Sequence, residues 1–343
     1  MLELLHSQSL TLWIVVGFLA LSLLLYCLLG GADFGAGVLE IFLQKKHHAE
    51  HHKIIEKAMG PVWEANHMWL ILMVVILFVG FPEVYSRISI NLHIPLTAML
   101  IGIIARGCSF TFRHYDAKKG RSQKSYTVFF IFSSLWTPFF QGVIMGALIS
   151  GGIHSEFTTY REGFVDPWFR PFPLALGLFT VCLFTFLAAV YLIGESPEGE
   201  VRQSFTRRAR FASIATVIAG GLVFFCGWKD GVAIMPSFMV SGLTRVCLVL
   251  ATLSLPILWI ALKKEWIWMT RALAGAQVVF ILAAWLWIQF PVLVHVPGGD
   301  LTFVNTHAPE KTLFQLAAAL VVGSTLILPS LFYLFRVFKL DEE

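Results

Sequence analysis

The sequence predicts an all-α protein, a polytopic transmembrane helix bundle of about nine spans. Of the 343 residues, 57% are hydrophobic and only 13% are charged, whereas a soluble domain carries about 25% charged residues. Nine apolar segments are long enough to cross a bilayer, which takes about 20 residues. Lysine and arginine gather in alternate loops, as in a chain that passes repeatedly through a membrane. We therefore expect a single integral membrane domain over residues 1–343.

The nine predicted spans follow one another without a soluble insertion between them. The sixth is the shortest and has the least defined ends. In chain order the spans cover residues 10–42, 60–80, 92–112, 126–150, 171–194, 211–227, 238–262, 266–290 and 312–337.

A recurring pattern suggests that the bundle contains an internal repeat. Glycine followed by an acid occurs near the end of the first span, at Gly31 and Asp33, and again at the end of the fifth, at Gly194 and Glu195. This recurrence predicts a four-plus-four helix repeat, over residues 10–150 and 171–290. The last span, 312–337, is then added to the repeat.

The basic residues predict the orientation of the chain. Loops that carry lysine and arginine stay in the cytoplasm, so we expect the N-terminus outside and the C-terminus inside a bacterial or archaeal cytoplasmic membrane. The first residues carry no Lys or Arg, so they do not resemble a cleavable signal peptide. The loops after spans one, three, five and seven and the C-terminus hold Lys45, Lys46, Lys53, Lys57, Arg113, Lys118, Lys119, Arg121, Lys124, Arg202, Arg207, Arg208, Arg210, Lys263, Lys264, Arg271, Arg336 and Lys339; the other loops hold Arg87, Arg161, Arg170, Lys229 and Lys311.

Cysteine usage and motifs exclude several classes of function. The five cysteines form neither a C-x-x-C nor a C-x-x-C-H motif, so the sequence indicates neither a disulfide framework nor covalent haem attachment. No nucleotide-binding loop and no nucleic-acid-binding patch is visible.

Two groups of histidines could in principle bind a metal. His47, His48, His51 and His52 lie in the first cytoplasmic loop, and His295 and His307 lie in the last outer loop. In both places we favour a solvated polar surface as the explanation.

The start of the second span places polar groups where lipid-soluble sequence should begin. On a helix Trp63, Asn66 and His67 share one face. Glu64 lies one position round from that face and three residues from His67. Ionisable groups at membrane depth are costly and usually face protein or water. These residues have two interpretations. Glu64 is an acid at a helix start beside an interfacial tryptophan, or the group conducts protons or faces a partner.

Two further ionisable residues fall at the same depth. Asp33 lies near the cytoplasmic end of span one, and Glu40 follows seven residues later on a similar face. Arg106 lies at the cytoplasmic end of span three. Because successive spans alternate in direction, the acids, His67 and Arg106 share the inner half of the bilayer on three consecutive helices. Arg106 either compensates a buried carboxylate, Glu64 rather than Asp33, or reaches the lipid headgroups.

The glycines of span one have two interpretations. Small residues let a neighbouring helix approach closely, and plain helix packing is the favoured explanation for Gly35 and Gly37. Alternatively, the face that includes Trp63 and these glycines packs on a partner subunit and borders an oxygen route.

Taken together, these motifs resemble subunit II of the cytochrome bd-type quinol oxidases, over nearly the whole chain and in order. The second and fourth of the matching pieces are the specific ones. The pieces are residues 31–37 (GADFGAG), 63–70 (WEANHMWL), 81–85 (FPEVY), 106–113 (RGCSFTFR), Gln141-Gly142 with Gly146, Gly199-Glu200 and 335–339 (FRVFK).

The resemblance implies a role within a larger complex. Enzymes of this family reduce dioxygen to water with electrons from quinol, and the b- or d-type haems belong to subunit I. Subunit II is a haem-free partner that supports assembly and helps to deliver protons or oxygen. The resemblance therefore implies that this chain binds no haem or metal and associates with subunit I, the bilayer and the quinol pool. A small single-span subunit is a further expected partner.

This sequence departs from the family pattern at three positions. The family often has Asp-Gly at Glu64 and Ala65, an acid at Gly30, and Glu at Thr111. We expect proton-path residues at Asp33, Glu64 and His67, with Trp63, Asn66 and Arg106 as neighbours. Two alternatives remain, an ion-coupled transporter with acids in its spans and a purely structural assembly subunit.

Overall fold

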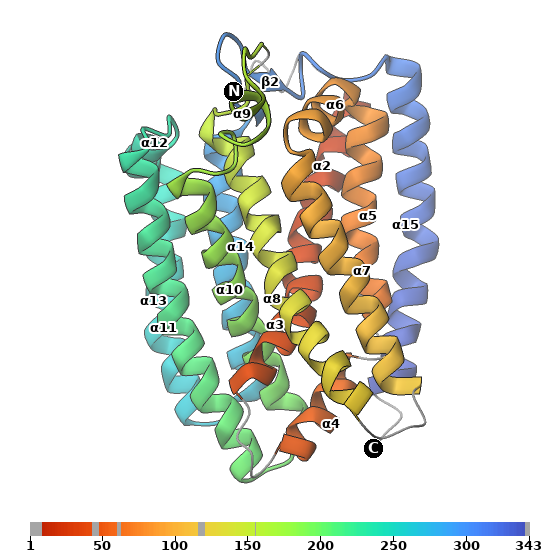
Figure 1. Ribbon diagram of the computed structural model, residues 1–343, viewed down its shortest axis with the longest axis vertical. Helices are drawn as coiled ribbons and strands as arrows, with labels where there is room; N and C mark the ends of the chain where they lie inside the picture. Colours follow the sequence, from red (N-terminus) through yellow and green to blue (C-terminus); the bar gives the residue numbers. More distant parts are fainter. Residues whose placement is uncertain (1–8, 43–47, 60–62, 116–120, 155, 340–343) are drawn as a thin grey trace.

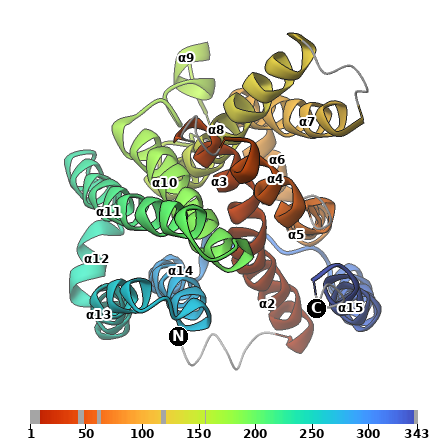
Figure 2. The same ribbon diagram turned by 90° about the horizontal axis from the view of Figure 1, so that it is seen from below.

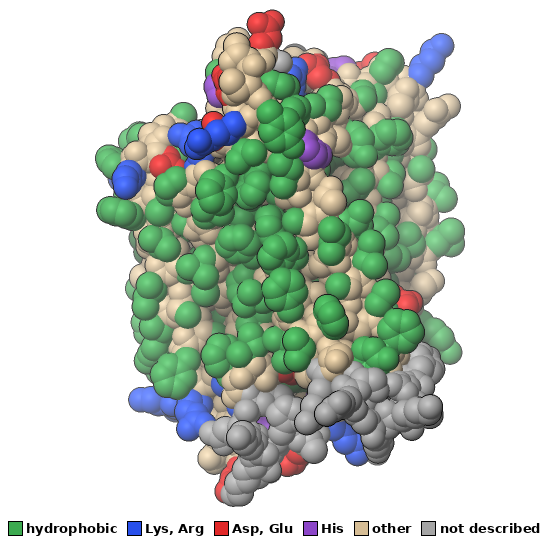
Figure 3. Space-filling model, viewed as in Figure 1, with side chains coloured by type: hydrophobic (Ala, Val, Ile, Leu, Met, Phe, Trp, Pro, Cys, Tyr) green, Lys and Arg blue, Asp and Glu red, His purple; other side chains and the backbone are tan. Residues whose placement is uncertain are grey.

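The computed structural model describes residues 9–42, 48–59, 63–115, 121–154 and 156–339, which form a helical bundle (Figure 1). In this part of the chain nine helices are long and apolar enough to cross a membrane. Hydrophobic side chains cover the middle of the face seen in Figure 3, and charged side chains gather at its two ends. The predicted all-α transmembrane bundle is confirmed.

Nine helical segments coincide with the predicted spans, and short elements connect them. The elements are α2 (Leu10–Leu25), η1 (Tyr26–Gly30), α3 (Gly31–Leu39), η2 (Glu40–Phe42), α4 (His48–Met59), α5 (Trp63–Gly80), α6 (Pro82–Asn91), α7 (His93–Tyr115), α8 (Arg121–Ser150), α9 (Tyr160–Phe164), α10 (Pro171–Glu195), α11 (Glu200–Lys229), α12 (Met235–Val240), α13 (Gly242–Lys263), α14 (Ile267–Gln289), β1 (Val292–Val294), β2 (Leu301–Thr302) and α15 (Glu310–Lys339).

Two spans differ from their predicted extent. The sixth, expected over 211–227, belongs to the 30-residue helix α11, because arginine is a good helix former and the basic run before the apolar segment continues the same helix. The seventh, expected over 238–262, is interrupted at Ser241, whose backbone is extended. This break separates α12 from α13.

Helix α10 is the central element of the bundle. It packs against α11, α8, α3 and α14, and its side chains are buried from Leu183 to Val190. The last span, α15, packs against α2 and α5, at the edge of the bundle seen from below in Figure 2. The four-plus-four repeat over 10–150 and 171–290 remains a prediction.

One end of the bundle carries α4, the connection from α10 to α11 and the C-terminus (Figure 1). We call this the basic end, since the described lysines of α4 and the arginines at the start of α11 lie there. The opposite end carries α6, α9 and the antiparallel pair of β1 and β2. Span one therefore runs from the opposite end toward the basic end and brings α3 close to α4.

The glycines of α3 allow this helix to lie directly against two neighbours. A Cβ atom at Gly35 would overlap the backbone of Phe184 in α10, and one at Gly37 would overlap the Ser134 hydroxyl in α8. The idea that these two glycines face a partner subunit is therefore wrong, since α10 and α8 of the same chain already occupy that side.

We expect Gly35→Ala to destabilise the protein, because the added methyl group meets rigid backbone of α10. Overpacking of this kind costs about 1–3 kcal/mol. The thermal unfolding midpoint of the purified protein should fall. Gly17→Ala in α2 is the matched control, because nothing lies within 4 Å of a Cβ at that position. Equal midpoints for the two variants would contradict the close approach of α3 to α10.

Candidate functional site

The carboxylate of Asp33 is buried inside the bundle near the basic end. Its side chain is 1% exposed, and Oδ2 accepts a hydrogen bond of 2.7 Å from Nδ2 of Asn66. The backbone oxygen of Asp33 accepts a second bond of 2.7 Å from Nη2 of Arg106. The structure thus joins an acid, an amide and a guanidinium from spans one, two and three, as the sequence predicts.

Arg106 is enclosed by protein. It is 4% exposed, and its guanidinium lies over the rings of Phe34 and Phe130, 4.6 and 5.3 Å from their centroids. The alternative that Arg106 reaches the lipid headgroups is therefore wrong.

Glu64 takes a different position from the one expected. Its side chain is exposed on α5, whereas Asn66, two positions later on the same helix, is buried. Two positions correspond to more than half a turn, so the two side chains leave the helix on different sides. Arg106 contacts Asp33, and our preference for Glu64 as its partner is wrong.

His67 lies between the buried cluster and the helix surface. Its Nδ1 is 2.8 Å from the backbone oxygen of Trp63, so it donates to that carbonyl. The rings of Tyr26, Phe34 and Trp63 surround the imidazole, with centroids 5.5 to 6.5 Å away. Its place beside Asn66 agrees with the shared helix face expected from the sequence.

A polar group that the sequence did not predict lies farther from the basic end. Nε2 of Gln141 in α8 donates a hydrogen bond to the hydroxyl of Tyr26, which begins the π-helical segment η1. Nearby in α8, the hydroxyls of Ser134 and Thr137 are fully buried and have no hydrogen-bond partner among the described residues. Buried polar atoms of this kind commonly bind ordered water. A glutamine within an apolar span was the available signal.

The first histidine group does not form the solvated surface that we expected. His51 is fully buried, and its ring lies 5.0 Å from that of Phe205 in α11. His52 lies 3.5 Å from Glu56 within α4, and His48 begins that helix. His47 lies outside the described residues.

The two histidines of the second group make polar contacts within the last outer loop. His295 pairs with Asp300 at 3.2 Å, and Nδ1 of His307 lies 2.9 Å from the backbone oxygen of Ala308. Across the described residues, no group of three or more His, Cys, Asp or Glu side chains could hold a metal ion.

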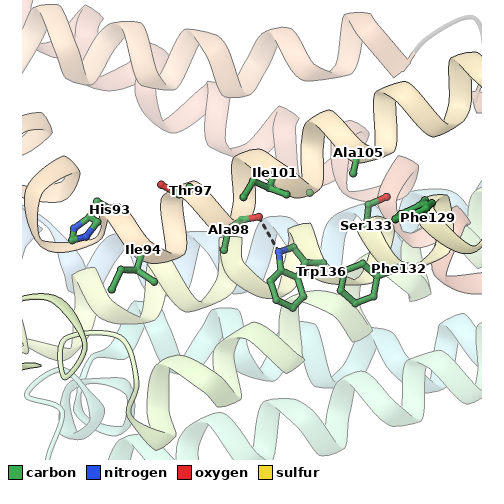
Figure 4. A pocket seen from close by; sticks show the side chains of 11 residues that line it. His93, Ile94, Thr97, Ala98, Ile101, Ala105, Phe129, Phe132, Ser133 and Trp136 are labelled. Atoms are coloured by element: carbon green, nitrogen blue, oxygen red, sulfur yellow. Dashed lines mark hydrogen bonds between the residues drawn. The ribbon is translucent and has the colours of Figure 1, made fainter.

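A groove of about 520 Å³ lies between α7 and α8 (Figure 4). It extends from His93 to Ala105, and most of its lining is apolar, including Ile101 and Phe132. Trp136 closes one side, where its Nε1 donates a hydrogen bond of 2.8 Å to the backbone oxygen of Ala98. No carboxylate lines the groove, so it suits an apolar ligand.

A comparison with protein families agrees with the sequence resemblance. The family model described as cytochrome bd terminal oxidase subunit II matches residues 10–338. The chain belongs to this family. It is a multi-pass membrane subunit of an oxidoreductase, and the family match does not favour the ion-coupled transporter.

Individual relatives agree with this bd oxidase subunit II assignment, and a solved structure shares the fold. The chain is 25% identical to cytochrome bd ubiquinol oxidase subunit 2 of Bacillus subtilis, over 91% of this chain and 90% of that protein. It is 25% identical to the bd-I ubiquinol oxidase subunit 2 of Escherichia coli K12, over 61% and 54% of the two chains. The bd oxidase structure from Geobacillus thermodenitrificans has the same fold, with a TM-score of 0.76 at 21% identity, over 97% of this chain and 100% of that one.

A double-mutant cycle should show that Arg106 of this bd oxidase subunit is coupled to Asp33. Leaving a buried charge without its counter-charge costs about 3–5 kcal/mol. We therefore expect Arg106→Gln, which removes the cation that donates to the Asp33 backbone oxygen, to lower the thermal stability of the complex strongly. Adding Asp33→Asn should recover part of the loss, with a coupling of about 0.5–3 kcal/mol. The control cycle of Arg106→Gln with Glu64→Gln should be additive. Coupling to Glu64 alone would contradict the observed geometry.

Proposed function

We propose that this chain works with a haem-bearing subunit I to oxidise quinol and to reduce dioxygen to water. The named relatives support this proposal, since they include two ubiquinol oxidase subunits and a putative menaquinol oxidase subunit of Bacillus subtilis, 20% identical over 93% of this chain. In this proposal subunit I holds the b- or d-type haems and a small single-span subunit completes the complex. This chain contributes no redox centre.

We infer that the basic end faces the cytoplasm, with the N-terminus outside. The excess of lysine and arginine in the loops at that end supports this orientation. Protons for dioxygen reduction are then taken from the side on which α4 and the C-terminus lie.

The contribution of this chain is a proton path that includes Asp33. A buried carboxylate that an amide holds in place, close to the basic end, is the single observation that carries the proposal. A path through apolar helices needs titratable or hydrogen-bonding groups whose proton affinity is set by burial and neighbours. Asp33 and Asn66 supply such groups, and His67 extends them along α5.

Glu64 belongs to the side of the path that faces subunit I. Its side chain is exposed on this chain at the start of α5, where the same helix also exposes Ile71 and Phe78. A charged group that faces lipid at this depth is costly. Contact with subunit I removes that cost and places a second carboxylate between Asp33 and the haem-bearing partner.

Replacing Asp33 tests the proton path directly. Asp33→Asn keeps the size and one hydrogen-bonding oxygen but cannot carry a proton, so oxygen consumption per haem should fall by about tenfold or more. Glu83→Gln in α6 is the control, since this exposed carboxylate lies at the opposite end of the bundle. Haem content should stay normal in both variants. If Asp33→Asn and Glu64→Gln both turn over at the normal rate, the chain is a structural assembly subunit.

The groove between α7 and α8 favours a second role, the passage of oxygen. Dioxygen is apolar and partitions into lipid, and the groove offers an apolar depression on the side of the bundle. Ala105→Phe should fill it and raise the KM for oxygen, while kcat at saturating oxygen stays unchanged. A normal KM in this variant would exclude the groove as an oxygen route.

A further inference from the structure

A buried acid–arginine pair lies closer to α4 than the contact between Arg106 and the Asp33 backbone. Nη1 of Arg113 donates to both carboxylate oxygens of Glu40, at 3.2 and 3.1 Å. The side chain of Glu40 is 0% exposed and that of Arg113 is 2% exposed. Removing either of two charged groups that are buried in this way leaves the other charge unpaired and is strongly destabilising.

The Asp33–Arg106 contact and the Glu40–Arg113 pair lie on the same two helices, although Arg106 donates to the backbone oxygen of Asp33 and Arg113 donates to the carboxylate of Glu40. Glu40 follows Asp33 by seven residues on span one, and Arg113 follows Arg106 by seven residues on α7. Seven residues make about two turns, or roughly 10 Å along a helix. The ring of Phe130 lies against both guanidiniums, 5.3 Å from Arg106 and 4.4 Å from Arg113. We call this arrangement the acid–arginine ladder.

The second pair of the ladder is connected to the protein surface through α4. Nε of Arg113 lies 3.2 Å from Oε1 of Glu56, so one guanidinium touches two carboxylates. Oε2 of Glu56 lies 3.5 Å from Nδ1 of His52. The side chains of Glu56 and His52 are 29% and 21% exposed, whereas Glu40 is fully covered. Titratable groups thus lead from solvent to the buried Glu40.

The space between the two pairs contains polar atoms without protein partners. Ser134 of α8 meets span one at Gly37, which lies between Asp33 and Glu40. Its hydroxyl is fully buried and has no hydrogen-bond partner among the described residues, and the same holds for Nε of Arg106. Such atoms are typically satisfied by ordered water, and water between the pairs would connect the two carboxylates.

We propose that Glu40 is the proton-loading residue of this subunit, with His52 and Glu56 as its entrance and Ser134 as the link to Asp33. This inference rests on the proposed proton path and defines its cytoplasmic half. The Glu40 carboxylate accepts one proton that arrives from water by way of Glu56, and it passes that proton through water at Ser134 to the Asp33 carboxylate. Arg113 holds the Glu40 carboxylate in place, and Arg106 holds the backbone of Asp33.

The charges around Glu40 suit this exchange. Arg113 faces it from α7 and Glu56 lies on the other side of the same guanidinium from α4, while Arg208 of α11 donates to the backbone oxygen of Phe42 nearby. Because Arg113 serves two carboxylates, protonation of Glu40 leaves the guanidinium paired with Glu56. The proton can therefore arrive without leaving an unpaired buried cation.

Glu40→Gln in the assembled complex is the first test. We expect turnover and the rate of proton uptake after oxygen is added to the reduced complex to fall by about tenfold. The loss should shrink as the pH is lowered by about two units, since more protons then reach Asp33 directly; a purely structural defect would not recover in this way. Glu195→Gln is the matched control. Glu195 is the last residue of α10, at the same end of the bundle as Glu40, and it also pairs with an arginine, Arg271. This variant should behave like the wild type.

Ser134→Ala is the second test, and it stays informative if Glu40→Gln fails to assemble. It removes one hydroxyl and adds no atoms, so the fold should persist while proton uptake slows several-fold. Normal uptake in Ser134→Ala, or in an assembled Glu40→Gln, would overturn the inference. If Asp33→Asn is slow at the same time, the proposed path stands and protons enter it elsewhere. If Asp33→Asn is also normal, the proposed function fails as well.

Discussion

The burial of the Asp33 carboxylate is the constraint on which the rest of this structure depends. A charge at that depth is costly, so the surrounding helices must supply donors and a counter-charge. Asn66 from α5 donates to the carboxylate at 2.7 Å, and Arg106 from α7 brings its positive charge to the backbone oxygen of the same residue, also at 2.7 Å. The glycines of α3 contribute to this burial, because they let the helix that carries Asp33 approach α8 and α10 closely enough to exclude lipid.

The two halves of the chain treat their charged groups differently at the basic end. In the first half Glu40 and Arg113 are covered completely, and a helix in the loop, α4, shields them. In the second half Glu195 and Arg271 also pair, but their side chains are 28% and 23% exposed. A partly exposed pair contributes little to stability, whereas removing one partner of a buried pair is strongly destabilising. This asymmetry agrees with the proposal that the proton path lies in the first half.

Of the residues predicted for the site, Asp33, Asn66 and Arg106 meet in the structure, whereas the predicted partner of Arg106 differs. Apolar span lengths and alternating direction place Asp33, Glu64 and Arg106 in the same half of the bundle, and the structure agrees. The choice of Glu64 as the partner of Arg106 was wrong because the rotation of α5 turns Asn66 inward and Glu64 outward. Tyr26 and Gln141 were missed, since their contact joins residues 115 positions apart.

The sequence by itself determined the class of the protein, the number of its spans and the family to which it belongs. These properties depend on local hydrophobicity and on short motifs, which act over a turn or a span of helix. Only the tertiary structure decided which side chains meet. The pairing of Glu40 with Arg113, the shared contact with Glu56 and the enclosure of Ser134 depend on how separate helices rotate and cross. That rotation is set by side-chain packing between helices, which no single segment encodes.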